Sequence, residues 1–112
     1  MHRGEVWLVK LDPTIGSEIQ KTRPAVIVSS DAVGALPIKV IVPFTDWKER
    51  YEIARWLVRI DPDPENGLTK PSAADALQIR SVSEQRLVRR LGVLQLQQVE
   101  QIIEAVGKIL QR

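Results

Sequence analysis

The sequence contains no cysteine and only one histidine, His2, among its 112 residues. Without thiols the chain can form neither a disulfide framework nor a thiolate metal site. A single histidine next to the amino terminus also argues against a zinc centre and against a Ser-His catalytic triad. We therefore expect a protein that works without a metal and without a cofactor.

Long apolar runs are also missing. No stretch approaches the length of a membrane-spanning helix. Arg3 and Glu5 interrupt the amino terminus before the apolar core of a signal peptide could form. From these absences we expect a cytoplasmic protein.

The composition that remains is that of an ordinary globular domain, with 44% hydrophobic and 27% charged residues. The length predicts one domain covering residues 1–112. A net charge of +2 permits RNA binding without requiring it. Arg86, Arg89 and Arg90 form a dense basic cluster, which we interpret as a solvated surface.

Alternating or wholly apolar segments separated by polar turns predict a mainly β protein. The expected strands are Glu5–Leu11, Pro24–Ser30, Lys39–Phe44, Arg55–Ile60, Ala73–Arg80 and Val88–Val93. Pro24–Ser30 is apolar enough to be covered on both faces. Asp46–Tyr51 and Ser83–Leu87 are expected to form loops or single helical turns, and Asp61–Pro71 a long surface loop.

One amphipathic helix is expected over Gln95–Leu110. Its apolar residues recur at helical spacing and form one stripe: Val99, Ile102, Ile103, Val106 and Leu110. Several short strands followed by one such helix predict a small twisted antiparallel sheet or barrel with the helix packed against it.

Arg23 stands where a polar loop becomes an apolar strand. Pro24 biases the backbone of Arg23 toward an extended conformation, so the guanidinium lies at the mouth of the strand beside a loop that carries Glu18. This arrangement suits an anionic ligand. The alternative is an arginine that only covers a surface edge.

Five motifs in order resemble the MazF/PemK family of toxin endoribonucleases, the mRNA interferases of type II toxin–antitoxin systems. The motifs are Asp12-Pro13-Thr14-Ile15-Gly16-Ser17-Glu18, Arg23-Pro24-Ala25-Val26-Ile27-Val28-Ser29, Val42-Pro43-Phe44-Thr45, Gln78-Ile79-Arg80-Ser81 and Gln85-Arg86-Leu87. The resemblance runs over nearly the whole chain. It implies the SH3-like barrel shared by the MazF, PemK and CcdB toxins, a homodimer, and an antitoxin partner with an acidic, disordered tail.

The resemblance also implies a reaction. The ribose 2′-OH of single-stranded RNA attacks the neighbouring phosphate without a metal, which leaves a 2′,3′-cyclic phosphate and a 5′-OH end. By position, Arg23, Thr45 and Glu18 match catalytic residues of the family. The expected RNA contacts are Ser17, Lys21, Thr22, Trp47 and Arg80.

Three of these residues also have simpler interpretations. Thr45 is a strand-end threonine that can bond to local backbone, Trp47 can pack against the barrel, and Glu18 can be a solvated loop residue.

Leu77 departs from the family pattern, because many members carry an acidic residue at this position. Asp75 lies two residues earlier and so on the same face of the expected strand, where it is a possible substitute base or support. The alternative is a catalytically inactive RNA- or protein-binding module on the same barrel. A gyrase poison of a related toxin family is disfavoured, since that activity is associated with a terminal Trp-Gly-Ile and this chain ends Ile109-Leu110-Gln111-Arg112.

Overall fold

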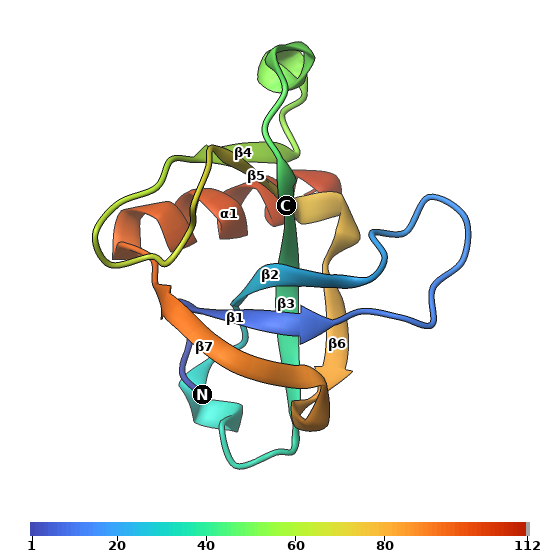
Figure 1. Cartoon of the computed structure of the whole chain (residues 1–112), viewed down its shortest axis with the longest axis vertical. Coiled ribbons are helices and arrows are strands. Elements are labelled where there is room, and N and C mark those ends of the chain that lie inside the picture. Colours follow the sequence, from blue (N-terminus) through green and yellow to red (C-terminus); the bar gives the residue numbers. More distant parts are fainter. Residues whose placement is uncertain (112) are drawn as a thin grey trace.

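A computed structural model describes residues 1–111 as an antiparallel sheet of seven strands with one α-helix against it (Figure 1). The strands are β1 (Glu5–Lys10), β2 (Thr22–Ile27), β3 (Ile38–Asp46), β4 (Leu57–Ile60), β5 (Ser72–Asp75), β6 (Arg80–Ser83) and β7 (Leu87–Val93). The helix is α1 (Leu96–Ile109), and the 3-10 turns are η1 (Asp31–Val33), η2 (Glu49–Ile53), η3 (Ala76–Gln78) and η4 (Glu84–Arg86). Within these residues no helix is both long and apolar enough to cross a membrane.

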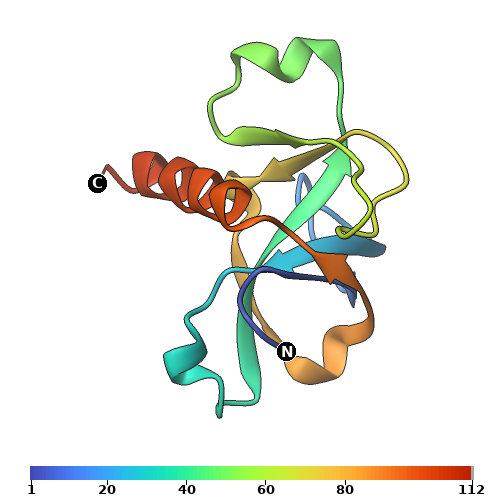
Figure 2. The same ribbon diagram turned by 90° about the vertical axis from the view of Figure 1, so that its left-hand side faces the viewer.

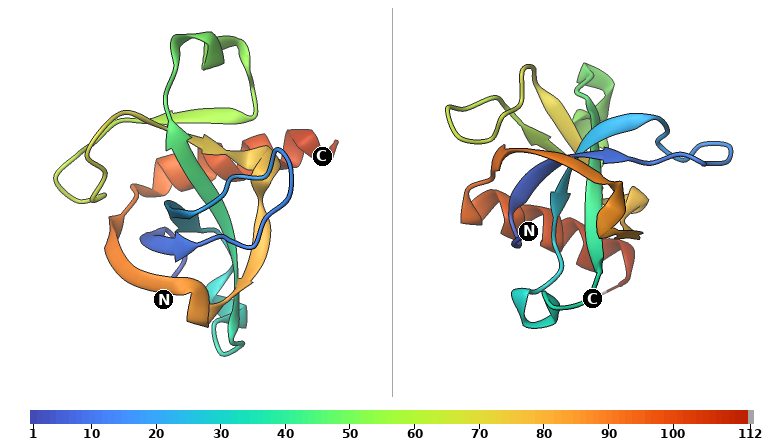
Figure 3. Two further views of the ribbon diagram at one scale, coloured as in Figure 1. Left: turned by 45° about the vertical axis from the view of Figure 1, so that its right-hand side comes forward. Right: turned by 60° about the horizontal axis from the view of Figure 1, so that its bottom comes forward.

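β3 is the strand around which the sheet is built, and it runs through the middle of every view (Figures 1 and 3). Along one edge it pairs with β2. Along the other, Ile38–Ile41 pairs with β6 and Phe44–Asp46 pairs with β5. The expected strand Lys39–Phe44 is therefore longer than predicted. Pro43, which has no N–H to donate, falls in the gap between the β6 and β5 pairings.

Both faces of β2 and β3 are buried, as the apolar sequence of β2 predicted. Val26, Val42 and Phe44 belong to one apolar cluster that also takes residues from α1. Ala25 and Ile27 point the other way, into a second cluster inside the curl of the sheet. The curl and the helix that closes one side of it are seen in Figure 2.

The helix begins and ends one residue inside the predicted range. Val99 and Ile102 are buried as expected, but Leu110 is 65% exposed and lies beyond the last helical residue, so its place in the buried stripe was wrong. At the other end the Gln95 backbone N–H donates to Oε1 of Gln98 at 3.1 Å. This bond satisfies a backbone donor at the helix start.

The predicted strand Ala73–Arg80 is wrong, because a 3-10 turn divides it into β5 and β6. Asp75 causes the break: its Oδ1 accepts a hydrogen bond of 3.1 Å from the Leu77 N–H and so caps η3. Asp75 and Leu77 consequently do not share a strand face. The Arg55–Ile60 strand is also shorter than predicted and begins at Leu57, while Asp46–Tyr51 leads into the turn η2.

The side chain of Asn66 is completely buried and organises the loop 61–71 from within. Its Nδ2 donates to the Asp61 carbonyl at 2.9 Å, and its Oδ1 accepts from the Leu68 N–H at 3.0 Å. The next residue, Gly67, has φ +72°, and a Cβ there would lie 2.1 Å from the Leu91 carbonyl oxygen. Only glycine fits this close approach of loop and strand.

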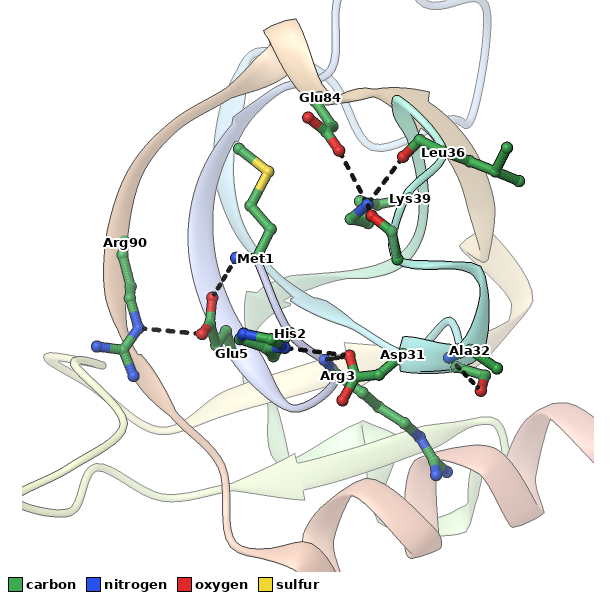
Figure 4. A network of polar contacts seen from close by, with 12 residues as sticks. Met1, His2, Arg3, Glu5, Asp31, Ala32, Leu36, Lys39, Glu84 and Arg90 are labelled. Carbon is green, nitrogen blue, oxygen red and sulfur yellow. Dashed lines mark hydrogen bonds and ion pairs between the residues drawn. The ribbon is translucent and has the colours of Figure 1, made fainter.

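Polar contacts fix the amino terminus and the η1–β3 connection at the end of the molecule opposite η2 (Figures 1 and 4). The buried Lys39 side chain donates to the carbonyl oxygens of Gly34 and Leu36 and to Oε1 of Glu84 at 2.9–3.1 Å. Nε of Arg90 lies 3.7 Å from the Glu5 carboxylate. Each of the three ammonium protons of Lys39 thus has an acceptor, which indicates a structural role for this side chain.

Candidate active site

Arg23 and Thr45 line one cleft of about 330 Å³, which we call the Arg23 cleft. It lies between the start of β2, the end of β3, the loop after Gly67, and β7. The lining residues are Leu8, Thr22, Arg23, Pro24, Phe44, Thr45, Asp46, Gly67, Leu68, Thr69, Lys70, Ser72, Arg89 and Leu91. Of the residues predicted from the sequence, the cleft therefore brings together Arg23, Thr45 and Thr22.

The register of the sheet explains why Arg23 and Thr45 are neighbours. Ala25 pairs with Pro43 at the end of the β2–β3 pairing, and Arg23 and Thr45 each lie two residues beyond that pair on their strands. Residues two apart on a strand point to the same face, so both side chains extend from one side of this strand pair. A single phosphate group can therefore contact both side chains.

Both side chains have polar atoms available for a ligand. Nε of Arg23 donates to the Gln20 carbonyl at 3.4 Å, while within residues 1–111 its terminal nitrogens make no hydrogen bond or ion pair. Oγ1 of Thr45 has no hydrogen-bond partner among the same residues either. The local backbone bond considered as the alternative for Thr45 is therefore not formed.

The charge of the cleft is predominantly positive. Lys70 lies 3.1 Å from the Asp46 carboxylate, so these two charges compensate each other. Arg23 and Arg89 have no acidic partner within the described part of the chain. Two guanidinium groups around an open cleft favour an anion with several oxygen atoms, such as a phosphate.

Glu18 does not join this group. It lines a different cavity, also of about 330 Å³, together with Ser17, Leu77 and Arg80. Its Oε1 accepts a hydrogen bond of 2.6 Å from the Ile15 N–H, within the β1–β2 loop itself. This loop and the loop 61–71 project on opposite sides of β3 (Figures 1 and 3). The predicted trio of Arg23, Thr45 and Glu18 is thus divided between two sites in this chain.

Gln78 is a positioning residue that sequence reasoning missed. Its Nε2 donates to the Ser17 carbonyl at 2.9 Å and its Oε1 accepts from the Ile19 N–H at 3.2 Å, so one side-chain amide holds the β1–β2 loop. Arg80 adds a bond of 3.1 Å from Nη1 to the Leu11 carbonyl. Both residues belong to the motif Gln78-Ile79-Arg80-Ser81 named above. The amide of Gln78, which can both donate and accept hydrogen bonds, was the feature that could have indicated this role.

Trp47 packs within the protein, which agrees with the alternative given for it. Its ring lies beneath the Arg59 guanidinium at 5.3 Å and meets the Tyr51 ring edge-on at 6.0 Å. It does not line the Arg23 cleft. Lys21 is exposed in the β1–β2 loop and also lies outside the cleft lining.

Asp75 does not line the Arg23 cleft. It lies in a third cavity of about 470 Å³, which Thr45 also lines and which we call the Trp56 pocket. Its lining residues are Thr45, Arg50, Tyr51, Ile53, Ala54, Trp56, Leu57 and Asp75. Burial raises the pKa of the Asp75 carboxyl above the ordinary value of 3.8, against hydrogen bonds from the η3 backbone that lower it. Leu77 lines the Glu18 cavity instead, so the two positions face different cavities.

The basic cluster on η4 and β7 was interpreted as a solvated surface, but its members differ. Arg86 Nη1 donates to the carbonyl oxygens of Lys10 and Asp12 and so supports the β1–β2 loop. Arg90 lies near Glu5, and Arg89 belongs to the Arg23 cleft. Among residues 1–111 no group of three or more His, Asp or Glu side chains is arranged to hold a metal ion.

Residues 2–110 match the family described as the PemK-like, MazF-like toxin of type II toxin-antitoxin systems. The chain belongs to this family. A curated relative, endoribonuclease MazF9 of Mycobacterium tuberculosis, is 35% identical over 112 residues, covering 95% of this chain and 92% of the relative. The predicted family is therefore confirmed, and the name of the relative supports the predicted class of enzyme.

Solved structures confirm the predicted fold. MazF from Deinococcus radiodurans is similar with a TM-score of 0.80 at 18% identity, covering 100% of this chain and 97% of the other. A mycobacterial endoribonuclease in complex with its cognate antitoxin is similar with a TM-score of 0.76 at 21% identity, covering 99% and 95%. The mainly antiparallel sheet with a carboxy-terminal helix is thus the barrel of this toxin family.

Proposed function

We propose that this protein is the toxin of a type II toxin–antitoxin pair and acts as a sequence-selective endoribonuclease on single-stranded RNA. The observation that carries the proposal is the Arg23 cleft, which within residues 1–111 is lined by a guanidinium whose terminal nitrogens have no partner and by a hydroxyl that makes no hydrogen bond. The relative named endoribonuclease MazF9 supports the same activity.

In the proposed reaction the scissile phosphate binds between Arg23 and Thr45. The Arg23 guanidinium, which stays protonated at physiological pH, stabilises the additional negative charge that forms when the 2′-OH attacks phosphorus. The Thr45 hydroxyl donates to a phosphate oxygen and holds the group in line. As the bond from the 2′ oxygen to phosphorus forms, the bond from phosphorus to the 5′ oxygen breaks; the 2′-OH releases one proton to water and the leaving 5′ oxygen takes one up. The products are a 2′,3′-cyclic phosphate and a 5′-OH, and DNA is not a substrate because it lacks the 2′-OH. No metal takes part.

Arg89, Thr22 and Thr69 extend the cleft, and we assign them contacts to the flanking phosphates or sugars. Ser17, Glu18, Lys21 and Arg80 then belong to the opposite side of β3, where a second stretch of RNA would bind. This division replaces the single cluster expected from the sequence.

Leu77 does not favour the inactive binding module. It lines the Glu18 cavity and does not line the Arg23 cleft. Because the two groups that would contact the phosphate are both retained, the proposed activity does not depend on an acidic residue at this position.

The proposed partners are RNA, a cognate antitoxin and a second copy of the chain. A similar solved structure is a complex of an endoribonuclease with its antitoxin, which supports the antitoxin. An acidic antitoxin segment would complement Arg23 and Arg89 in the cleft. A toxin that cuts mRNA acts where mRNA is, in the cytoplasm.

The test is to incubate the purified protein with a long single-stranded RNA in excess EDTA and to map the ends. We expect cutting at defined sites that leaves cyclic phosphate, or its hydrolysed product, and 5′-OH ends. If EDTA abolished all cutting and magnesium restored it, the proposed chemistry would be wrong.

A further inference from the structure

The Trp56 pocket adjoins the Arg23 cleft, and Thr45 lines both. Thr45 pairs with Ala73 across β3 and β5, and Asp75 follows two residues later on β5. Thr45 and Asp75 therefore leave the same face of the small sheet as diagonal neighbours, which lie about 7–8 Å apart. A ligand held at Thr45 is within reach of the Asp75 carboxylate.

The pocket has two kinds of lining. Trp56, Tyr51 and Leu57 supply aromatic and aliphatic surface, and Trp56 remains 43% exposed. Tyr51 is held in place by the Trp47 ring edge and by the Arg50 guanidinium 5.4 Å from its centroid. An apolar pocket with a few convergent polar groups is typical of a small-ligand site.

Asp75 is the acidic group in this pocket. Its Oδ1 is oriented by the Leu77 N–H, and within the residues that the structure describes no lysine or arginine forms an ion pair with it. A half-buried carboxylate without an ionic partner gains most from a ligand that donates two parallel hydrogen bonds. The Watson–Crick edge of guanine, with its N1–H and N2–H donors, has this pattern, whereas those of adenine, cytosine and uracil do not.

We propose that the Trp56 pocket binds a guanine next to the scissile phosphate, with the base against Trp56 and its Watson–Crick edge on Asp75. The inference rests on the proposed endoribonuclease function and deepens it, because it assigns one position of the RNA recognition sequence. An acidic antitoxin segment is a poorer occupant, since its carboxylates would meet Asp75.

The experiment compares three proteins on a randomised single-stranded RNA library: the wild type, Asp75→Asn, and Glu104→Gln as a control that removes a carboxylate from the exposed face of α1. Asn retains the acceptor oxygen that caps η3 but presents one acceptor and one donor to the ligand. The wild type should be enriched for guanine at one fixed position beside the cut. Asp75→Asn should reduce that preference about tenfold to a hundredfold and cut sites without guanine as before, while Glu104→Gln should match the wild type.

A second substrate isolates the contact. Replacing that guanine by inosine removes only the N2 amino group, which should slow the wild type and leave Asp75→Asn unaffected. Enrichment for another base, an unchanged profile in Asp75→Asn, or an equal loss of cutting at every site would each overturn the proposal.

A binding measurement tests the guanine pocket independently of whether the protein cuts RNA. An uncleavable 2′-O-methyl RNA carrying guanine should bind the wild type more tightly than its inosine counterpart, whether or not the protein cuts RNA. A wild type that cuts no RNA but shows this difference would contradict the endoribonuclease and support the guanine pocket. Equal binding of the two RNAs would overturn the pocket alone.

Discussion

Arg23, near the start of β2, and Thr45, near the end of β3, line one cleft just beyond the Ala25–Pro43 pair of the two strands. Twenty-one residues separate them in the sequence and include the η1 turn, so only the pairing of the two strands makes them neighbours. If this pair binds the scissile phosphate, Arg23 contributes charge and Thr45 contributes positioning. Substituting each residue in turn can therefore separate the two contributions to the rate of cutting.

Arg23→Ala should lower the rate of RNA cutting by about 10²–10³, the scale for losing one donor that stabilises transition-state charge. RNA affinity should fall much less, since Arg23 is one phosphate contact among several. Thr45→Val, which removes the hydroxyl at constant shape, should act in the same direction. Single-turnover rates and binding of uncleavable RNA measure the two effects.

Arg90→Ala is the matched control, because it removes the same charge outside the cleft, and this variant should cut RNA at the normal rate. Equal losses of rate in Arg90→Ala and Arg23→Ala would exclude a specific role for Arg23.

Asn66→Ala should lower the free energy of unfolding by about 1–3 kcal/mol, because it leaves buried and partly buried backbone groups without partners. These groups include the Asp61 carbonyl and the Leu68 N–H. Denaturant unfolding measures the loss. Glu65→Ala, on the exposed side of the same loop, should change stability by less than about 0.5 kcal/mol. If the two variants were equally stable, the loop would not depend on the Asn66 side chain.

Ile102→Ala should destabilise the protein by about 2–5 kcal/mol, because Ile102 is completely buried where α1 packs against the sheet. Ile103 is partly buried and packs against the same cluster, so Ile103→Ala should cost less. Leu110→Ala should have almost no effect, since that side chain is 65% exposed. Thermal or denaturant unfolding of the three variants gives the order. A large loss in Leu110→Ala would show that its exposed surface is covered, for example by a second copy of the chain.

The pH dependence of stability should show opposite contributions from two aspartates. Burial raises the folded pKa of Asp75, so the native state keeps a proton that the unfolded chain has released, and stability falls as pH rises through that window. A backbone hydrogen bond from Arg3 lowers the pKa of Asp31, so its stabilising contribution is present above the unfolded value of 3.8 and is lost in acid. Relative to the wild type, Asp75→Asn should therefore gain stability from about pH 3 to pH 7, and Asp31→Asn should lose it. Urea unfolding at both pH values measures the change, and the same sign in both variants would contradict these pKa directions.

Local pattern was enough to predict β2, β7 and the helix. Strand β2 contains the apolar run Pro24–Ile27, although it begins two residues before the predicted start and ends three before the predicted end, and the repeat of Val99, Ile102 and Val106 has helical period. In these segments the side chains that pack together are set by the backbone period itself. Leu110 fits the same period and is exposed, because the helix ends before it and nothing within residues 1–111 covers it.

The division of the site could not be predicted from sequence spacing. Asp75 fits the alternation of a strand, but its carboxylate caps the following turn and ends the strand there. Leu77 then turns toward the Glu18 cavity and Asp75 toward the Trp56 pocket. Glu18 stands five residues before Arg23, yet the loop between them carries it to the other side of β3. These placements depend on tertiary contacts, such as the two bonds of the Gln78 amide.

The central claim is that the Arg23 cleft promotes attack by the ribose 2′-OH on the phosphate held by Arg23 and Thr45. The most direct measurement uses one RNA of defined sequence, made with ribose throughout or with a single 2′-deoxyribose at a mapped cut site. We expect the wild type to cut the all-ribose RNA at that site and to leave a 2′,3′-cyclic phosphate and a 5′-OH, while the substituted RNA stays intact there and is cut at its other sites. Cutting of the substituted RNA at the same place and rate, or products with 3′-OH and 5′-phosphate ends, would contradict the account.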